Sequence, residues 1–260
     1  MTKVLDIVNY LKTKYPLELA STFDHGKVGL QFGSMNKEVK KVLIALDGTS
    51  KVVNEAVENN VELLITHHPF MFNSMLSLNY DSPMGQKMLK VFKNDLNIYA
   101  MHTNYDSAIG GMNDMLGEML GFDNTNALFD ENVSDNFLRY GNIKEMTLGE
   151  YVEEVKKVFG LKSVRVVGNL NKKIKTVGIV GGSGTSELFK AIHSGCDCFV
   201  TGEIKQNHAI DASEYGLCLI EVPHAVEGFY KEIIKRELTN EFPEVEFIVS
   251  IEDKDPFTII

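Results

Sequence analysis

Short β-rich runs alternate with segments of helical periodicity along most of this chain, and this alternation constrains its fold more than any other feature. The β-rich runs are, in chain order, "VLIAL" (42–46), "ELLIT" (62–66), "NIYAM" (97–101), "KTVGIV" (175–180), "CDCFVT" (196–201) and "LCLIEV" (217–222). Each is followed by a turn or loop and then, in most cases, by apolar residues at helical spacing. Strands joined through helices are typical of parallel sheets, so the sequence predicts an α/β protein.

The order of the elements predicts two lobes. Residues 121–145 are polar, rich in Asn and Asp and without periodicity, and we interpret them as the connection between the lobes. We expect a first α/β lobe at residues 1–125, completed by residues 228–260, and a second α/β lobe at residues 126–227. The expected architecture is therefore two interleaved α/β lobes with mostly parallel sheets.

Composition and charge argue against two classes of function. The 260 residues are 24% charged and 44% hydrophobic, which is ordinary for a globular protein, and their formal charge is −10. An acidic chain without a basic run is not expected to bind nucleic acid. No apolar run approaches the roughly 20 residues of a membrane helix. Cys196, Cys198 and Cys218 lie in apolar runs and are expected to be buried thiols, which predicts a cytoplasmic protein.

Residues with metal-binding or acid–base chemistry follow the predicted strands, at the points where those strands end. They are His67 and His68 after "ELLIT", His102 and Asp106 after "NIYAM", Glu203 after "CDCFVT", and His224 and Glu227 after "LCLIEV". Ligands of parallel α/β sheets bind at the carboxyl ends of the strands, so these side chains are expected to converge in one cleft. His224 and Glu227 are three residues apart at the start of a helix, so both can face one point.

A mixture of imidazoles and carboxylates without a thiolate suits Zn, Mn, Fe or Co. Five candidates are more than the three protein ligands of a typical catalytic zinc, and with a bridging carboxylate they would fit two divalent ions. The five candidate ligands are His67, His68, Asp106, His224 and Glu227. Adjacent histidines cannot share one face of a regular strand, but they can turn toward one site where the strand ends. The alternative is that each histidine only forms hydrogen bonds, which is our interpretation of His193.

Six motifs together resemble the dinuclear-metal-centre family called Nif-three-like, whose members are often labelled homologues of type 2 GTP cyclohydrolase I. The motifs are "VGLQFG" (28–33), "LLITHHP" (63–69), "HTNYDSAIGGMND" (102–114), "GIVGGSG" (178–184), "TGE" (201–203) and "PHAVE" (223–227). The resemblance implies a two-lobed subunit with the dimetal site in the cleft between the lobes. It also implies a ring-shaped homohexamer and, at this length, the compact form of the family without an inserted domain.

By position, the family's metal ligands fall on the same five residues, with Glu227 as the bridging carboxylate. The sequence departs from the family at two places. It has "FDHGKVGLQ" (23–31) where "WDNVGLQ" is usual, so Lys27 replaces an asparagine and the role of Asp24 is open. After "TGE" it has Asn207 at a position where the family commonly has histidine, with His208 next to it.

Two functions remain open from the sequence. The first is a metal-dependent hydrolase acting on a small anionic substrate such as a nucleotide. The resemblance implies that this substrate is similar to GTP. In this function His102 or His208 would protonate the leaving nitrogen, and Glu203 would be a substrate contact or a partner of a metal ligand. The second is a non-catalytic, metal-binding hexameric scaffold or regulatory protein. The glycines of "GGSG" would bind phosphate through backbone N–H groups or simply form the turn between a strand and a helix.

Overall fold

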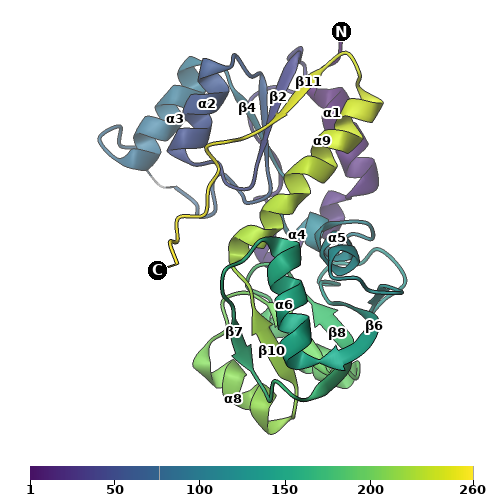
Figure 1. Ribbon diagram of the computed structural model, residues 1–260. Helices are drawn as coiled ribbons and strands as arrows, with labels where there is room; N and C mark the ends of the chain where they lie inside the picture. Colours follow the sequence, from purple (N-terminus) through teal and green to yellow (C-terminus); the bar gives the residue numbers. More distant parts are fainter. Residues whose placement is uncertain (76, 260) are drawn as a thin grey trace. The chain divides into compact units, whose positions relative to one another are not determined.

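The chain forms two compact units, each built around its own sheet (Figure 1). The computed structural model describes residues 1–75 and 77–259. Unit 1 contains residues 1–105 and 228–255, and unit 2 contains residues 106–227 together with the C-terminal residues from Pro256. Helices cover the sheet in both units, which confirms the predicted α/β class.

The boundaries of the units differ from the expected lobes. Residues 106–125 were expected in the first lobe, but they lie in unit 2. The reason is that α5 (Met112–Met119) packs against β6 (Arg139–Thr147) and β8 (Lys173–Ile179). The expected connection is also shorter than predicted, because its last residues belong to β6.

Unit 1 has a mainly parallel sheet with the strand order β1-β4-β3-β2-β11. Strands β4, β3, β2 and β11 run parallel, and β1 pairs antiparallel with β4. The elements are α1 (Val4–Lys14), η1 (Leu17–Leu19), η2 (Thr22–Asp24), β1 (Gly29–Phe32), β2 (Lys41–Ala45), α2 (Ser50–Glu58), β3 (Leu63–Thr66), α3 (Pro83–Lys93), β4 (Asn97–Ala100), α4 (Thr103–Ser107), α9 (Tyr230–Glu241) and β11 (Glu246–Val249). The chain passes from unit 1 to unit 2 within α4.

Helices cover both faces of this sheet, with α2 and α3 on one side and α1 and α9 on the other (Figure 1). Side chains at the start of α2 and α3 satisfy backbone N–H groups: Thr49 accepts from Val52 N at 3.2 Å and Ser82 accepts from Gly85 N at 3.0 Å. On the opposite face, Tyr15 at the end of α1 donates to Glu237 of α9 at 3.0 Å.

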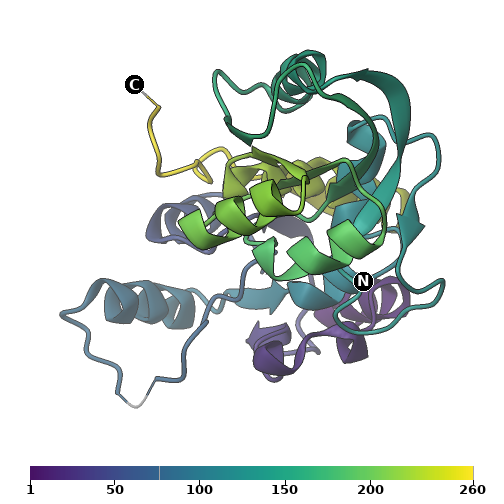
Figure 2. The same cartoon turned by 90° about the horizontal axis from the view of Figure 1, so that it is seen from below.

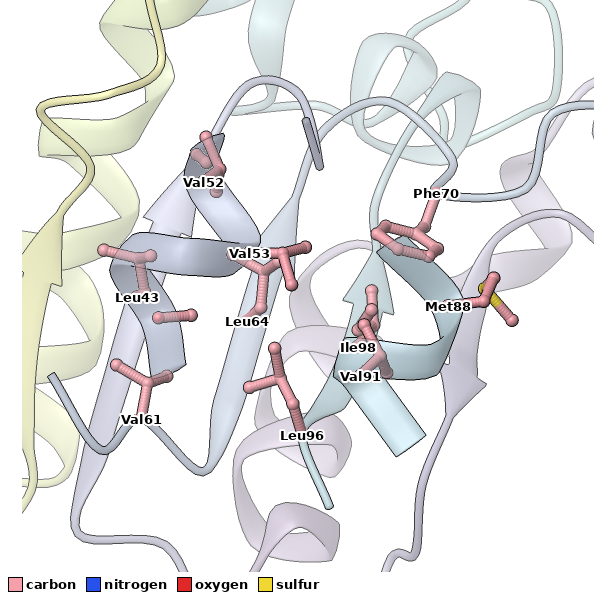
Figure 3. Close-up of a cluster of buried hydrophobic side chains, with 12 residues drawn as sticks. Leu43, Val52, Val53, Val61, Leu64, Phe70, Met88, Val91, Leu96 and Ile98 are labelled. Carbon is pink, nitrogen blue, oxygen red and sulfur yellow. The ribbon is translucent and has the colours of Figure 1, made fainter. Parts of the chain in front are cut away.

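Figure 3 shows the core between the strands and the α2–α3 pair. Leu43, Leu64 and Ile98 extend from three neighbouring strands toward Val53 and Val91 of the helices, and all five are fully buried. Burying one such side chain contributes about 1.5–3 kcal/mol, so this cluster fixes the register of β2, β3 and β4. That register in turn places the ends of β3 and β4 side by side.

Unit 2 has a mixed sheet with the strand order β5-β6-β8-β9-β10-β7. Strands β8, β9 and β10 are parallel, whereas β5, β6 and β7 pair antiparallel with their neighbours. Mostly parallel pairing therefore describes unit 1 better than unit 2. The remaining elements are β5 (Asn126–Ala127), α6 (Leu148–Phe159), β7 (Arg165–Val167), η3 (Thr185–Glu187), α7 (Leu188–His193), β9 (Cys198–Thr201), α8 (Gln206–Glu214), β10 (Cys218–Glu221) and η4 (His224–Phe229).

In unit 2, α7 and α8 cover one face of the sheet and α6 covers the other (Figure 2). Phe199 and Leu219 point toward α7 and α8 and join a buried cluster with Leu188 and Ala212 of those helices. Among the described residues, no helix has both the length and the apolar character required to cross a membrane.

Candidate metal centre

Three histidines of unit 1 meet at the carboxyl ends of β3 and β4. His67 and His68 directly follow β3, and His102 follows β4 after one residue. Because β3 and β4 are parallel neighbours, with Thr66 paired to Ala100, the chain leaves both strands at the same edge. Ring nitrogens of the three histidines lie within 4.8 Å of one another, so these side chains form one cluster of possible metal ligands.

The Nδ1 atom of each histidine in this cluster lies close to an oxygen. The Nδ1–O distances are 2.8 Å from His67 to the Met101 carbonyl, 2.9 Å from His68 to Asp47, and 2.5 Å from His102 to Asp24. Carbonyl and carboxylate oxygens accept hydrogen bonds, so Nδ1 is the atom that carries the hydrogen. In the neutral ring the lone pair is then on Nε2, the arrangement that a carbonyl or carboxylate partner imposes on metal-binding histidines.

Asp24 is the most buried of these acceptors, with no exposed surface. Its Oδ2 accepts from His102 Nδ1, from Thr103 Oγ1 at 2.6 Å and from Thr103 N at 3.3 Å. Burial by itself would raise the pKa of Asp24, but the hydrogen bonds from His102 and Thr103 and the attraction to His102 lower it below its ordinary value. Asp24 is thus held as a carboxylate that orients His102.

Three of the predicted ligands lie together in unit 2. A carboxylate oxygen of Asp106 is within 4.8 Å of one of Glu227, which is 3% exposed. The Oε2 atom of Glu227 is 3.0 Å from Nε2 of His224. Glu227 therefore lies close to both Asp106 and His224.

Glu203 contacts the other nitrogen of His224. Its Oε1 is 2.6 Å from Nδ1 of His224, which donates the hydrogen bond. Glu203 adopts a left-handed backbone conformation, with φ of 53°, directly after β9. The sequence left Glu203 open between a substrate contact, a partner of a metal ligand and a solvated loop carboxylate. In the structure it contacts His224, and 57% of its side chain is exposed.

The His224–Glu227 pair needs a positive charge, supplied either by a proton on His224 or by a metal ion. Because Nδ1 of His224 donates to Glu203, a neutral ring has its lone pair on Nε2, facing the carboxylate Oε2 of Glu227 at 3.0 Å. Two acceptor atoms at this distance repel each other unless a proton or a metal ion is shared between them. The donor set of imidazoles and carboxylates is also the one that Zn, Mn, Fe and Co prefer.

The "GGSG" turn packs directly against this pair. A Cβ atom on Gly182, where φ is +58°, would lie 2.5 Å from Oε1 of Glu227 and 3.0 Å from Nε2 of His224. The N–H groups of Gly181 and Gly184 donate to Asn113 Oδ1 and Thr201 Oγ1. A glycine at position 182 therefore leaves room for the side chains of Glu227 and His224. The N–H groups of Gly181 and Gly184 are hydrogen-bonded to side-chain oxygens of the protein.

Arg139 supports the chain next to Asp106, a role that no sequence pattern indicated. Its guanidinium is 1% exposed, pairs with Asp114 at 2.9 Å, and donates to the carbonyls of Ser107 and Ala108 at 3.2 and 3.1 Å. These carbonyls directly follow Asp106 at the end of α4. A buried arginine satisfied in this way fixes the backbone from which Asp106 extends.

His208 lies in the first turn of α8 and is half-buried. Among the residues that the structure describes, it is in none of the clusters of possible metal ligands. Its Nδ1 is buried and has no hydrogen-bond partner within that described part of the chain.

The sequence profile of one protein family, described as Duf34/NIF3 (NGG1p interacting factor 3), matches residues 2–256. The chain belongs to the DUF34/NIF3 family. This confirms the resemblance found in the sequence.

Relatives of this DUF34/NIF3 protein match it along its whole length. A Clostridium perfringens protein named "GTP cyclohydrolase 1 type 2 homolog" is 38% identical over 267 residues, covering 99% of this chain and 100% of the relative. The crystal structure of the Staphylococcus aureus hypothetical protein SA1388 is 32% identical, covers 99% of both chains and has a TM-score of 0.91. That of a Bacillus cereus protein related to NIF3 is 28% identical, covers 100% of this chain and 99% of that one, and also has a TM-score of 0.91.

Proposed function

We propose that this DUF34/NIF3 protein is a metal-dependent hydrolase that uses two divalent ions and acts on a nucleotide or another phosphorylated small molecule. His67, His68, Asp106, His224 and Glu227 would hold Zn, Fe, Mn or Co, with Glu227 as the bridging carboxylate. The observation that supports this most directly is the distance of 3.0 Å between Nε2 of His224 and Oε2 of Glu227. The two atoms can stay this close only if they share a proton or a metal cation. The imidazole cluster of unit 1 supplies the remaining ligands.

Bound divalent ions would supply an acidified water and stabilise negative charge at the attacked centre. The protein's own side chains would carry out the proton transfers. Asp24 holds the Nδ1–H of His102, so a protonated His102 presents its second hydrogen on Nε2. From that atom it can protonate a leaving group, which is the role we assign to it.

The substrate assignment rests on the relatives. Two clostridial relatives are named "GTP cyclohydrolase 1 type 2 homolog", which supports GTP or a similar purine nucleotide as the substrate. Hydrolytic opening of the imidazole ring would add water at the carbon between its nitrogens, and His102 would give its Nε2 proton to the nitrogen that leaves. Glu203 would hold His224 in place, and His208 remains a second candidate proton donor. The homohexamer implied by the resemblance is part of this proposal.

The test combines metal content with turnover. Wild-type protein, His68→Ala and Glu227→Gln would be loaded with Mn, Zn, Fe or Co, and metal per chain would be measured by plasma mass spectrometry. Release of formate or phosphate would then be followed over a panel of nucleotides and phosphoesters. His193→Ala is the matched control, because His193 lies at the end of α7 and in none of the ligand clusters of the described residues.

We expect about two ions per chain in the wild type and in His193→Ala, and a loss of metal and turnover in the other two variants. Full metal loading without turnover of any substrate would contradict the hydrolase and favour the non-catalytic metal-binding scaffold. A wild-type chain that takes up no metal would overturn both functions.

A further inference from the structure

The side chain of Asn113 connects the backbone of Asp106 to the backbone of Gly181. Asp106 is a predicted ligand, and Gly181 lies close to another, Glu227. Asn113 lies in the first turn of α5 and is 1% exposed. Its Nδ2 donates to the carbonyl of Asp106 at 3.1 Å, and its Oδ1 accepts from the N–H of Gly181 at 2.8 Å. One side chain therefore bridges the end of α4 and the glycine turn after β8.

The two partners fix the orientation of the amide. The carbonyl of Asp106 can only accept a hydrogen bond, and the N–H of Gly181 can only donate one. Rotating the amide by 180° would break both bonds and would bury two mismatched pairs of atoms. Of the uncharged side chains, only an amide of this length provides a donor and an acceptor at the two ends of the bridge.

The backbone of the glycine turn lies against the other two predicted ligands of unit 2, His224 and Glu227. A Cβ on Gly181 would lie 3.1 Å from Oε1 of Glu227, and one on Gly182 would lie 2.5 Å from the same atom. The backbone at these glycines therefore limits where the Glu227 carboxylate can lie. His224 contacts the same surface, since its Nε2 would be 3.0 Å from the Gly182 Cβ.

We propose that Asn113 is a positioning residue that sets the separation between Asp106 and the His224–Glu227 pair, so that this part of the metal centre is formed before an ion binds. The inference rests on the proposed metal-binding function and adds a residue to it. Arg139 holds the same end of α4 through the carbonyls of Ser107 and Ala108, so Asn113 fixes a segment that is already rigid on one side.

Removing the bridge should weaken metal binding more than it weakens folding. Loss of a partner that orients metal ligands typically lowers metal affinity by about 10- to 100-fold. Asn113→Ala loses both hydrogen bonds. Asn113→Asp keeps an acceptor for Gly181 but loses the donor to Asp106, so its affinity should also fall.

Asn136→Ala is the matched control. Asn136 is also fully buried in unit 2, and its Nδ2 donates to the Phe129 carbonyl at 3.1 Å. Within the part of the chain that the structure describes, its side chain forms no hydrogen bond to Asp106 or Gly181. Its replacement removes a buried amide of equal size elsewhere in the unit. A merely structural role for Asn113 would make the two alanine variants alike.

The experiment is calorimetric titration of metal-free, full-length protein with Zn²⁺ and with Mn²⁺, with circular dichroism to confirm folding. We expect a Kd about 10- to 100-fold higher in both Asn113 variants and an unchanged Kd in Asn136→Ala. Folded Asn113 variants with wild-type affinity would overturn the positioning role alone. If Asn113→Ala does not fold, Asn113→Asp decides the question. No binding by the wild type would instead remove the proposed function, and this inference with it.

Discussion

The Nδ1 atom of His102 lies 2.5 Å from Oδ2 of Asp24, a carboxylate with no exposed surface. The two residues are 78 positions apart in the chain. The same carboxylate oxygen also accepts two hydrogen bonds from Thr103, so Asp24 fixes both the ring of His102 and the start of α4.

Asp24→Asn should lower the free energy of unfolding by about 2 kcal/mol at neutral pH, because hydrogen bonds to a charged acceptor contribute about 1.5–3 kcal/mol. The folded pKa of Asp24 is lowered, so its stabilisation is present above the unfolded pKa of about 3.9 and is lost as the pH falls through the folded pKa. The difference between wild type and variant in urea unfolding should therefore shrink below about pH 4. An equal difference at all pH values would show that the carboxylate charge is not what stabilises the pair.

Gly182→Ala should displace Glu227 and reduce metal binding, because the new Cβ would lie 2.5 Å from Oε1 of that residue. Gly195→Ala is its control, since Gly195 has a similar φ of +74° but nothing within 4 Å of the added atom. Both variants should lose about 1–2 kcal/mol from the left-handed backbone. Only Gly182→Ala should lose metal in plasma mass spectrometry, and equal metal content in the two variants would contradict a role for this close approach.

The three cysteines should react with a thiol reagent only after unfolding. None forms a disulfide, and burial raises the pKa of Cys196 from 9.0 to about 12. Burial raises the pKa of Cys198 and Cys218 as well. Because the thiolate is the reactive form, labelling by a disulfide-forming dye at pH 8 should be slow in the native protein and complete in guanidinium. Rapid native labelling of Cys198 or Cys218 would show that the strand carrying that thiol opens to solvent. Cys196 lies before β9 and is only partly buried, so its protection rests more on its raised pKa.

Leu64→Ala should destabilise unit 1 by about 2–5 kcal/mol, the usual cost of deleting a fully buried leucine. Leu64 lies in the centre of the α2–α3 core shown in Figure 3 and is completely buried. Leu5→Ala is the control, because Leu5 of α1 is 39% exposed. Urea unfolding followed by circular dichroism measures both, and a loss below 1 kcal/mol for Leu64→Ala would mean that the cavity is filled by rearrangement.

Much of the fold could be predicted from local patterns. The β-rich runs became β2, β3, β4, β8, β9 and β10, because a buried strand is recognisable from a few consecutive apolar residues. The boundary between the units was harder to predict, because the unit to which α5 belongs depends on its packing against β6 and β8. The antiparallel pairing in unit 2 was not predicted for the same reason: pairing direction is set by contacts between distant segments.

The sequence by itself determined which residue types stand at the strand ends, and so the imidazoles and carboxylates available for a metal site. It also determined the family, because its six motifs occur in a fixed order along the chain. Only the tertiary structure decided that Nδ1 of His67 and Nδ1 of His68 each lie beside an oxygen, and that Asn113 and Arg139 support the backbone at Asp106. Those relationships join residues far apart in the chain, and the packing of helices on the sheets brings them within hydrogen-bond distance.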